Sequence, residues 1–259
     1  ECLAHVAEHS KIIVDALNKS GNLPYEVVWK PTMITNEVIR KTFNEANTDE
    51  NCAGVITWMH TFSPAKSWIL GLKEYRKPLC HLHTQFNEEI PYDTIDMDFM
   101  NLNQSAHGDR EHGYIAARMR LKRKVVAGYW KDETFQSKME TWIRAAIGAA
   151  ESKRVHVLRI SDNMRNVAVT DGDKVEAQIK LGWQVDHYGV GDIIKYVDAV
   201  TDDEIDAQMA EYEKNYIMDT DNIDSVRYQA REEVAIKKFL DERGFNAFHT
   251  NFEDLQGLR

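Results

Sequence analysis

The stretch of the sequence richest in groups that could bind a ligand is 93–119, where amide and hydroxyl side chains precede a histidine and an expected helix. The polar side chains are Asn101, Asn103, Gln104, Ser105 and His107. Amides donate and accept hydrogen bonds, and a neutral imidazole does one of each, so the run suits a ligand rich in hydroxyl groups. The alternative is a purely local role, because the same residue types satisfy free backbone N–H groups where helices begin.

Several histidines and carboxylates are candidate metal ligands. His81 and His83 alternate along an expected strand and therefore face the same side of it, a spacing that metal sites use. His107, Asp109, Glu111 and His112 are further candidates, but His107 and Glu111 share a helix face only if the helix starts early. Histidines in such positions are more often hydrogen-bonded core or pocket residues, so we expect no metal site within this chain.

Other catalytic and nucleotide-binding motifs are absent from the sequence. It contains neither of the glycine-rich nucleotide fingerprints and no G-x-S-x-G element. The run GVGDII at 189–194 lacks a third glycine and is interpreted as a loop before a helix. The two carboxylates of TDGDK at 170–174 are interpreted as helix-capping residues that favour the positive end of the helix dipole.

Composition narrows the class of protein. The 259 residues are 43% hydrophobic and 29% charged, an ordinary globular balance. The net charge of −10 disfavours binding to nucleic acid or to an anionic membrane, which requires a basic surface. The three cysteines form no CxxC pair and indicate free thiols in a reducing compartment. With no signal peptide and no membrane-spanning run, a cytoplasmic location is expected.

Hydrophobic periodicity predicts alternating strands and helices. Strands are expected at 25–29, 52–59, 78–83, 125–129, 155–160, 184–188 and 245–249. Helices are expected at 3–18, 35–46, 63–72, after His107-Gly108, and at 133–149, 171–181, 192–199, 202–215 and 225–243. This alternation predicts an α/β fold of two consecutive parallel-sheet, Rossmann-like or flavodoxin-like units, with a domain boundary between 151 and 152. The loops HTFSPAK, HTQFN and SDNMRN follow strand ends, where such folds carry function.

Five long strings, in the right order along the chain, closely resemble L-arabinose isomerases. They are HTFSPAK at 60–66, HTQFN at 83–87, DMDFMNLNQSAHG at 96–108, DNMRNVAVTDGDKVEAQIKLG at 162–182 and FEDLQGL at 252–258. The resemblance implies an N-terminal domain at 1–151 that lacks its opening strand, followed by a truncated central domain at 152–259. It also implies an enzyme that interconverts L-arabinose and L-ribulose, and often D-galactose and D-tagatose, with a divalent metal, usually Mn²⁺.

The resemblance also assigns expected site residues. The metal ligands and catalytic glutamates of the family lie beyond FEDLxGL, so none is expected here, and this chain alone is expected to be inactive. Phe62, Gln104 and His107 match positions that reach a neighbouring subunit's pocket, whereas Met164 and Phe252 match positions that line their own. Such enzymes are homohexamers built from trimers, acting on aldopentoses or aldohexoses. The alternative is a non-catalytic sugar-binding or assembly module.

Overall fold

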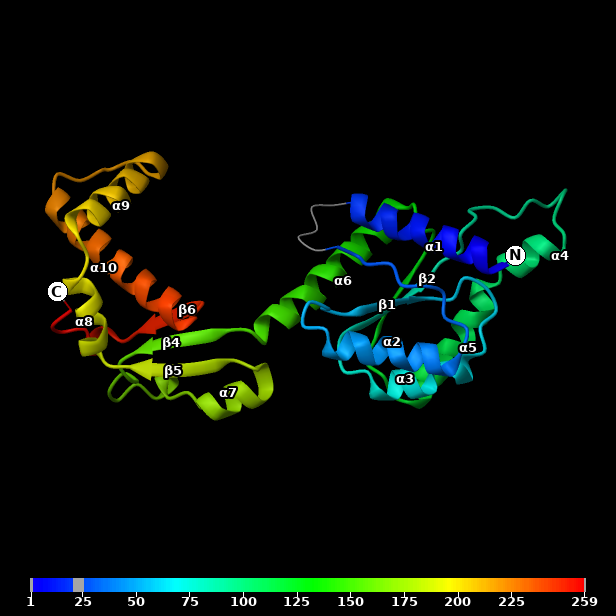
Figure 1. Ribbon diagram of the computed structural model, residues 1–259, viewed down its shortest axis with the longest axis horizontal. Helices are drawn as coiled ribbons and strands as arrows, with labels where there is room; N and C mark the ends of the chain where they lie inside the picture. Colours follow the sequence, from blue (N-terminus) through cyan, green and yellow to red (C-terminus); the bar gives the residue numbers. More distant parts are fainter. Residues whose placement is uncertain (1, 21–25, 259) are drawn as a thin grey trace. The chain divides into compact units, whose positions relative to one another are not determined.

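The computed structural model describes residues 2–20 and 26–258, which pack as two units, Glu1–Ala150 and Glu151–Arg259 (Figure 1). This division falls one residue from the boundary expected from the sequence. Each unit contains a three-stranded, all-parallel sheet with helices packed against it. The predicted α/β class with two parallel-sheet units is therefore confirmed. The expected opening strand before the chain stays a prediction.

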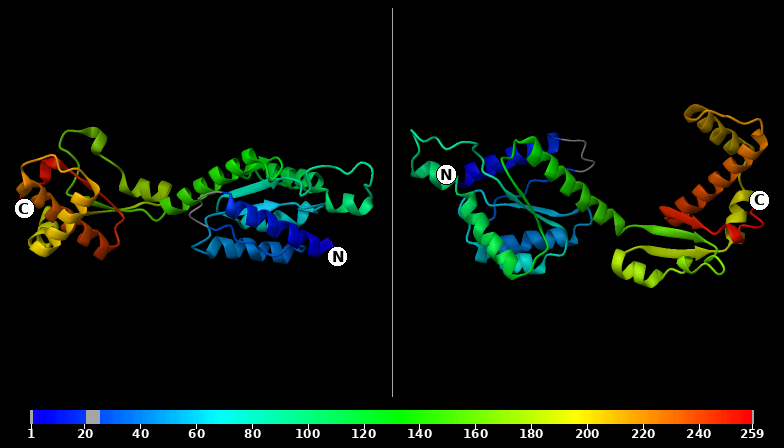
Figure 2. Two further views of the ribbon diagram at one scale, coloured as in Figure 1. Left: turned by 90° about the horizontal axis from the view of Figure 1, so that it is seen from above. Right: turned by 180° about the vertical axis from the view of Figure 1, so that it is seen from behind.

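Unit 1 is built on the sheet order β1-β2-β3. Its strands are β1 (Val55–Trp58), β2 (Leu79–His83) and β3 (Lys124–Ala127). Its helices are α1 (Cys2–Lys19), α2 (Asn36–Thr48), the 3-10 helix η1 (Ala65–Trp68), α3 (Ile69–Glu74), α4 (Met97–Leu102), α5 (Ser105–Arg118) and α6 (Glu133–Ser152). Helices α1 and α6 cover one face of the sheet, and α2 and α3 cover the other (Figures 1 and 2).

The alternation of side chains along β2 explains these layers. Cys80 and Leu82 enter the cluster formed with α1 and α6, whereas Leu79 enters the cluster formed with α2 and α3. Successive strand residues point to opposite faces, so His81 shares the second face with Leu79. Helices cover both faces of the sheet, so apolar residues of β2 point to both faces and do not alternate strictly with polar residues.

Unit 2 is built on the order β5-β4-β6. Its strands are β4 (His156–Ile160), β5 (Gln184–Tyr188) and β6 (Ala247–Thr250). Its helices are η2 (Ala168–Thr170), α7 (Lys174–Leu181), α8 (Val190–Asp198), α9 (Asp202–Asn215), α10 (Ile223–Arg243) and η3 (Phe252–Asp254). Leu158 and Ile160 of β4 pack with residues of α8 and α10, including Ile193 and Phe239, in one core.

The strand predicted at 25–29 is wrong for residues 26–29, which form no ladder with another strand; Tyr25 lies outside the described residues. The backbone of Val27 is instead satisfied by one side chain. Asn18 Nδ2 donates to the carbonyl of Val27 at 3.0 Å, and the Val27 N–H donates to Asn18 Oδ1 at 2.8 Å. An amide side chain has replaced the strand partner that this β-prone run requires.

Most helices were predicted, but the residues at which they begin often differ from the prediction. The helix expected from Ser63 begins as a 3-10 turn at Ala65, and Pro64 occupies its cap position without a side-chain hydrogen bond. Helix α5 starts at Ser105 and includes Gly108 instead of following it. Helix α4 was not predicted; Asp96 caps it by accepting from Phe99 N. Asp173, one of the two expected capping carboxylates, accepts from Glu176 N and starts α7.

Two further expectations concern cysteines and membranes. Cys80 is buried, Cys52 is half-buried and Cys2 is exposed, and all three are free thiols. Burial raises the pKa of the Cys80 thiol to about 12. Within residues 2–20 and 26–258, no helix combines the length and apolar character needed to cross a bilayer.

Candidate functional site

Three of the motifs meet at the carboxyl end of the unit 1 sheet. Gln85 Nε2 and Asn87 Nδ2 of HTQFN both donate to Asn103 Oδ1, at 2.8 and 2.9 Å. Ser105 Oγ donates to Gln85 Oε1 at 2.7 Å. The loop after β2 is therefore tied to the amide run and to the first residue of α5. Some of these amides therefore position the loops, while the role of the run in binding a ligand stays a prediction.

The side chains of Phe62 and His107 are brought together at this edge. Their ring centroids lie 4.8 Å apart in an edge-to-face arrangement, and Phe62 remains 50% exposed. His107 is exposed as well, so both rings have a free side. Gln104 is half-buried at the cap position of α5, where its carbonyl accepts from the His107 N–H at 3.0 Å and its side chain makes no capping bond. The amide of Gln104 is therefore available to a ligand.

Gly108 allows α5 to pack closely against the loop that follows β1. A Cβ at this position would lie 2.6 Å from the carbonyl oxygen of Thr61 and 2.9 Å from Met59 Cβ. Real Cβ atoms do not approach backbone this closely, so only glycine lets α5 pack against the loop that follows β1. Thr61 Oγ1 adds a hydrogen bond to the carbonyl of Asn101. The HTFSPAK loop and the amide run are thus in direct contact.

Three of the candidate metal ligands, His81, Asp109 and Glu111, make hydrogen bonds within the protein. His81 Nε2 lies 2.6 Å from Asp109 Oδ1, so this pair is joined by a direct hydrogen bond. The early start of α5 does place His107 and Glu111 four residues apart on one helix, but Glu111 Oε2 accepts the Ala65 N–H at 3.1 Å. No group of three or more His, Cys, Asp or Glu residues in the described part of the chain is arranged to hold a metal ion. These residues therefore do not fit a Mn²⁺ site.

Unit 2 holds Met164 and Phe252 on two adjoining loops. The loop that follows β4 and the turn η3 are joined through Asn251, whose Nδ2 donates to the carbonyl of Asn163 at 3.2 Å and to Asp254 Oδ2 at 2.9 Å. Met164 is half-buried and Phe252 is 73% exposed. Both side chains thus lie at the carboxyl end of the unit 2 sheet, in a unit separate from Phe62, Gln104 and His107.

Charged residues complete the unit 2 loops. Arg165 contacts Asp254, and its backbone N–H donates to Glu253 Oε2 at 2.8 Å. Ser161 Oγ donates to Asp254 Oδ2 at 3.0 Å. Ser161 and Asn166 adopt left-handed backbone angles, φ 71° and 61°. Such conformations in residues other than glycine require support from the surrounding structure, and the bond from Ser161 to Asp254 supplies it at Ser161.

Sequence reasoning singled out the loops but missed the residues that hold them. Gln85 and Asn251 carry the networks, and both stand shortly after strand ends, in loops where a hydrogen-bonding side chain has a structural use. That position was the available signal, although Gln85 bonds to residues 18 and 20 positions away and Asn251 bonds to one 88 positions away. Asp109 was considered only as a metal ligand.

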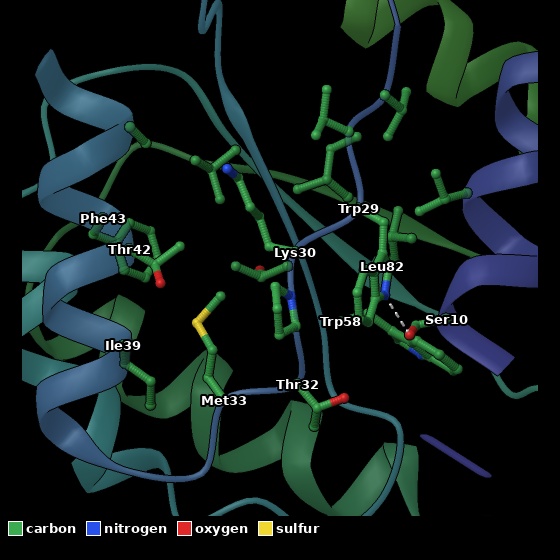
Figure 3. A pocket seen from close by; sticks show the side chains of 18 of the residues that line it. Ser10, Trp29, Lys30, Thr32, Met33, Ile39, Thr42, Phe43, Trp58 and Leu82 are labelled. Atoms are coloured by element: carbon green, nitrogen blue, oxygen red, sulfur yellow. Dashed lines mark hydrogen bonds between the residues drawn. The ribbon is translucent and has the colours of Figure 1, made fainter. Parts of the chain in front are cut away.

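A cavity of about 730 Å³ lies in unit 1, lined mainly by residues of α1, α2, β1 and the segment 26–34 (Figure 3). Trp29 crosses toward α1, where its Nε1 donates to Ser10 Oγ at 2.8 Å. Phe62 contributes to the lining, whereas Gln104 and His107 do not. Much of the wall is apolar, as Ile39, Phe43, Trp58 and Leu82 illustrate, so a hydroxyl-rich ligand would meet few hydrogen-bonding partners along it.

Comparison with known proteins agrees with this architecture. Residues 1–154 match the L-arabinose isomerase N-terminal domain, and residues 156–259 match the L-arabinose isomerase central domain. The whole chain is 58% identical over 260 residues to the L-arabinose isomerase of Clostridium beijerinckii, of which it covers 53%. It is 52% identical over 261 residues to L-arabinose isomerase 1 of Bacillus licheniformis, again covering 53%. The chain thus spans about half the length of these relatives, and it belongs to the L-arabinose isomerase family.

Proposed function

We propose that the polypeptide to which these two domains belong interconverts L-arabinose and L-ribulose, and also converts D-galactose to D-tagatose. Family membership and the names of the relatives support the reaction class. The observation that carries the proposal for this chain is the open pair of Phe62 and His107 beside the amide network. That arrangement offers one flat apolar face and several hydrogen-bonding groups, which together suit a sugar.

In this proposal the chain supplies walls of the pocket, and the catalytic carboxylates and the ligands of Mn²⁺ lie in polypeptide outside it. A bound divalent cation polarises the carbonyl and the adjacent hydroxyl oxygen of the sugar. Gln104 and His107 hydrogen-bond to sugar hydroxyl groups, while Phe62, Met164 and Phe252 provide apolar surface that excludes water. The half-buried and exposed positions of all five side chains suit this role.

The proposal includes a homohexamer built from trimers, in which Phe62, Gln104 and His107 complete the pocket of a neighbouring copy. The segment before α5 supports a subunit contact because it exposes several large apolar side chains. They are Ile90 at 51%, Tyr92 at 83%, Ile95 at 45%, Met97 at 62% and Met100 at 40%. A group of exposed large apolar side chains within one short segment is typical of an interaction site.

Activity assays on two lengths of polypeptide test the proposal. The 259-residue chain should bind Mn²⁺ weakly and convert no L-arabinose, whereas the chain extended to the length of its relatives should convert it. Robust turnover by the short chain would show that its own side chains hold the metal and the catalytic groups. No turnover by a folded, extended chain supplied with Mn²⁺ would contradict the isomerase assignment.

His107→Ala in the extended protein tests the pocket wall. Loss of one hydrogen bond to the sugar should lower kcat/KM by about tenfold or more without unfolding the protein. The matched control is His187→Ala, which removes an exposed imidazole on β5. Unchanged kinetics in His107→Ala would remove His107 from the site.

Calorimetry on the short chain distinguishes the other class of function. If the chain is a sugar-binding module, the monomer should bind L-arabinose at micromolar concentration. A pocket shared between subunits predicts little binding until the protein is assembled and loaded with metal.

A further inference from the structure

Asp109 is a buried carboxyl that joins α5 to the sheet. Its side chain is fully buried, with Oδ1 2.6 Å from His81 Nε2 and Oδ2 3.4 Å from His83 Nδ1. His81 Nδ1 in turn lies 2.9 Å from Thr57 Oγ1 of β1. A chain of polar contacts therefore runs from β1 through β2 to the second turn of α5. Oδ1 makes a hydrogen bond, whereas Oδ2 lies within ion-pair distance of His83 and has no hydrogen-bond partner among the described residues.

The geometry of α5 relates the position of Asp109 to that of His107 and its neighbour Phe62. Residues two apart on an α-helix are separated by about 200° around its axis, so Asp109 and His107 lie on opposite faces. Asp109 points to β2, and His107 consequently points outward, against Phe62. Turning α5 about its axis would carry Asp109 away from His81 and His107 away from Phe62 together.

We propose that Asp109 is a positioning residue for the sugar pocket: through its hydrogen bond to His81, with His83 close by, it sets the rotation of α5 and thereby the placement of His107 and Gln104. The sugar part of this inference rests on the proposed function. The geometric part stands without it, since it concerns only side chains in unit 1.

The surroundings of Asp109 favour the neutral forms of its carboxyl and of the neighbouring imidazoles, so a hydrogen bond and not an ion pair joins them. His81 and His83 face it from β2, and His112 stacks on His81 at 4.4 Å between ring centroids. Burial raises the pKa of Asp109, and burial lowers the pKa of His81 and of His112, whose protonation the Arg123 cation also disfavours. A hydrogen bond of 2.6 Å joins Asp109 to His81 at this buried position. An asparagine at 109 should therefore keep the anchor, because its amide can donate to or accept from His81, whereas an alanine can do neither.

Nuclear magnetic resonance on the 259-residue chain tests the geometric part. The ring protons of Phe62 and His107 should show a mutual Overhauser effect in the unaltered chain and in Asp109→Asn. In Asp109→Ala this effect should be lost and the His107 ring signals should move. Asp15→Asn on the exposed side of α1 is the charge-matched control and should leave both unchanged. Retention of the Overhauser effect in a folded Asp109→Ala would overturn the proposal.

His83→Ala keeps the test decisive if Asp109→Ala does not fold. The His83 side chain is 47% exposed, so its removal should be tolerated while one of the two anchoring contacts disappears. The His107 signals should then move, by less than in Asp109→Ala where that variant folds. Unmoved His107 signals in His83→Ala, combined with lost ring contact in Asp109→Asn, would contradict the anchoring scheme.

Kinetics on the extended protein test the sugar part. Asp109→Ala should lower kcat/KM about tenfold, mainly by raising KM, and Asp109→Asn should recover activity to within about threefold of the unaltered enzyme. Equal defects in both variants would indicate a general structural role and defeat the inference. If the extended protein does not isomerise sugars at all, the proposed function fails while the resonance result still decides the anchoring.

Discussion

The loops at the carboxyl ends of the two sheets are held in place by different kinds of interaction. At the carboxyl end of the unit 1 sheet, the loop after β2 is joined to the amide run by neutral groups, as in the hydrogen bonds among Gln85, Asn103 and Ser105. At the corresponding edge of unit 2, Arg165 and Asp254 bring opposite charges together around the buried Asn251. Arg165 is largely exposed, whereas the carboxyl that anchors unit 1, Asp109, is fully buried.

This difference shows what fixes each edge. Neutral hydrogen bonds and close packing do not weaken when salt is added, whereas exposed ion pairs are screened. The loops of unit 1 should therefore be fixed by packing and neutral hydrogen bonds, which do not depend on salt. The loop after β4 in unit 2 should be fixed by the buried amide of Asn251 together with ion pairs that salt weakens. Four changes test this contrast, beginning with the largest expected effect.

Gly108→Ala should break the unit 1 edge. The new Cβ would lie within 2.6 Å of a backbone oxygen, so α5 must move and the free energy of unfolding should fall by about 2–3 kcal/mol. Gly148→Ala is the control: nothing lies within 4 Å, and helix propensity predicts a gain of about 0.5–1 kcal/mol. Urea unfolding monitored by hydrogen exchange assigns the loss to unit 1. Equal stability in both variants would show that the close approach is unimportant.

Asn251→Ala should break the unit 2 edge. It removes the two bonds donated by Nδ2 and the one from the Glu253 N–H at 3.0 Å, which should cost about 2 kcal/mol. Asn215→Ala, which loses one exposed bond to Glu211, should change stability by less than about 0.5 kcal/mol. Thermal unfolding measures both. A small effect of Asn251→Ala would mean that charge, not the amide, holds this edge.

His60 makes unit 1 sensitive to acid. Burial, with help from His9 and His5, lowers its pKa to about 4 in the folded chain, below the ordinary value of 6.5. The unfolded chain therefore binds the proton first, and stability should fall as the pH drops from 6.5 toward 4. Melting temperatures across this range should decline less steeply in His60→Gln than in the unaltered chain. Parallel curves for the two proteins would exclude His60 as the cause.

Arg165→Gln should give the smallest effect and the clearest contrast. The lost pairs with Glu253 and Asp254 are worth less than about 1 kcal/mol at this exposed position. Hydrogen exchange of residues 161–170 should rise in this variant, and in the unaltered chain it should rise with added salt. Gln85→Ala, the unit 1 counterpart, should loosen its edge equally at low and high salt. Salt-independent behaviour at both edges would remove the distinction.

Periodicity was enough to predict most elements and the class of fold. The apolar run around β2 and the apolar stripe of α10 depend on local burial, which sequence patterns record directly. The strand prediction for residues 26–29 was wrong because a strand requires a hydrogen-bonded partner strand. In the described chain, the side chain of Asn18 bonds the backbone of Val27 instead. Helix α5 began early because Gly108 serves close packing and does not end the helix.

The site could be located from sequence only as a set of loops. Resemblance supplied Phe62 and His107, and the structure places these two rings together; their contact with a sugar stays a prediction. The bond between Asp109 and His81 joins residues 28 positions apart on different elements. No local pattern encodes such a contact, because it depends on how α5 packs across the sheet.

One edge of β1 pairs with no other strand in the part of the chain that the structure describes, and this has a practical consequence. Among the described strands β1 pairs with β2 alone, and the apolar cavity lies beside it. An open row of backbone N–H and C=O groups is a template on which another copy can add a strand. Purified preparations of the chain should therefore become turbid or form larger species as they are concentrated, and dilute handling will keep them in solution longest.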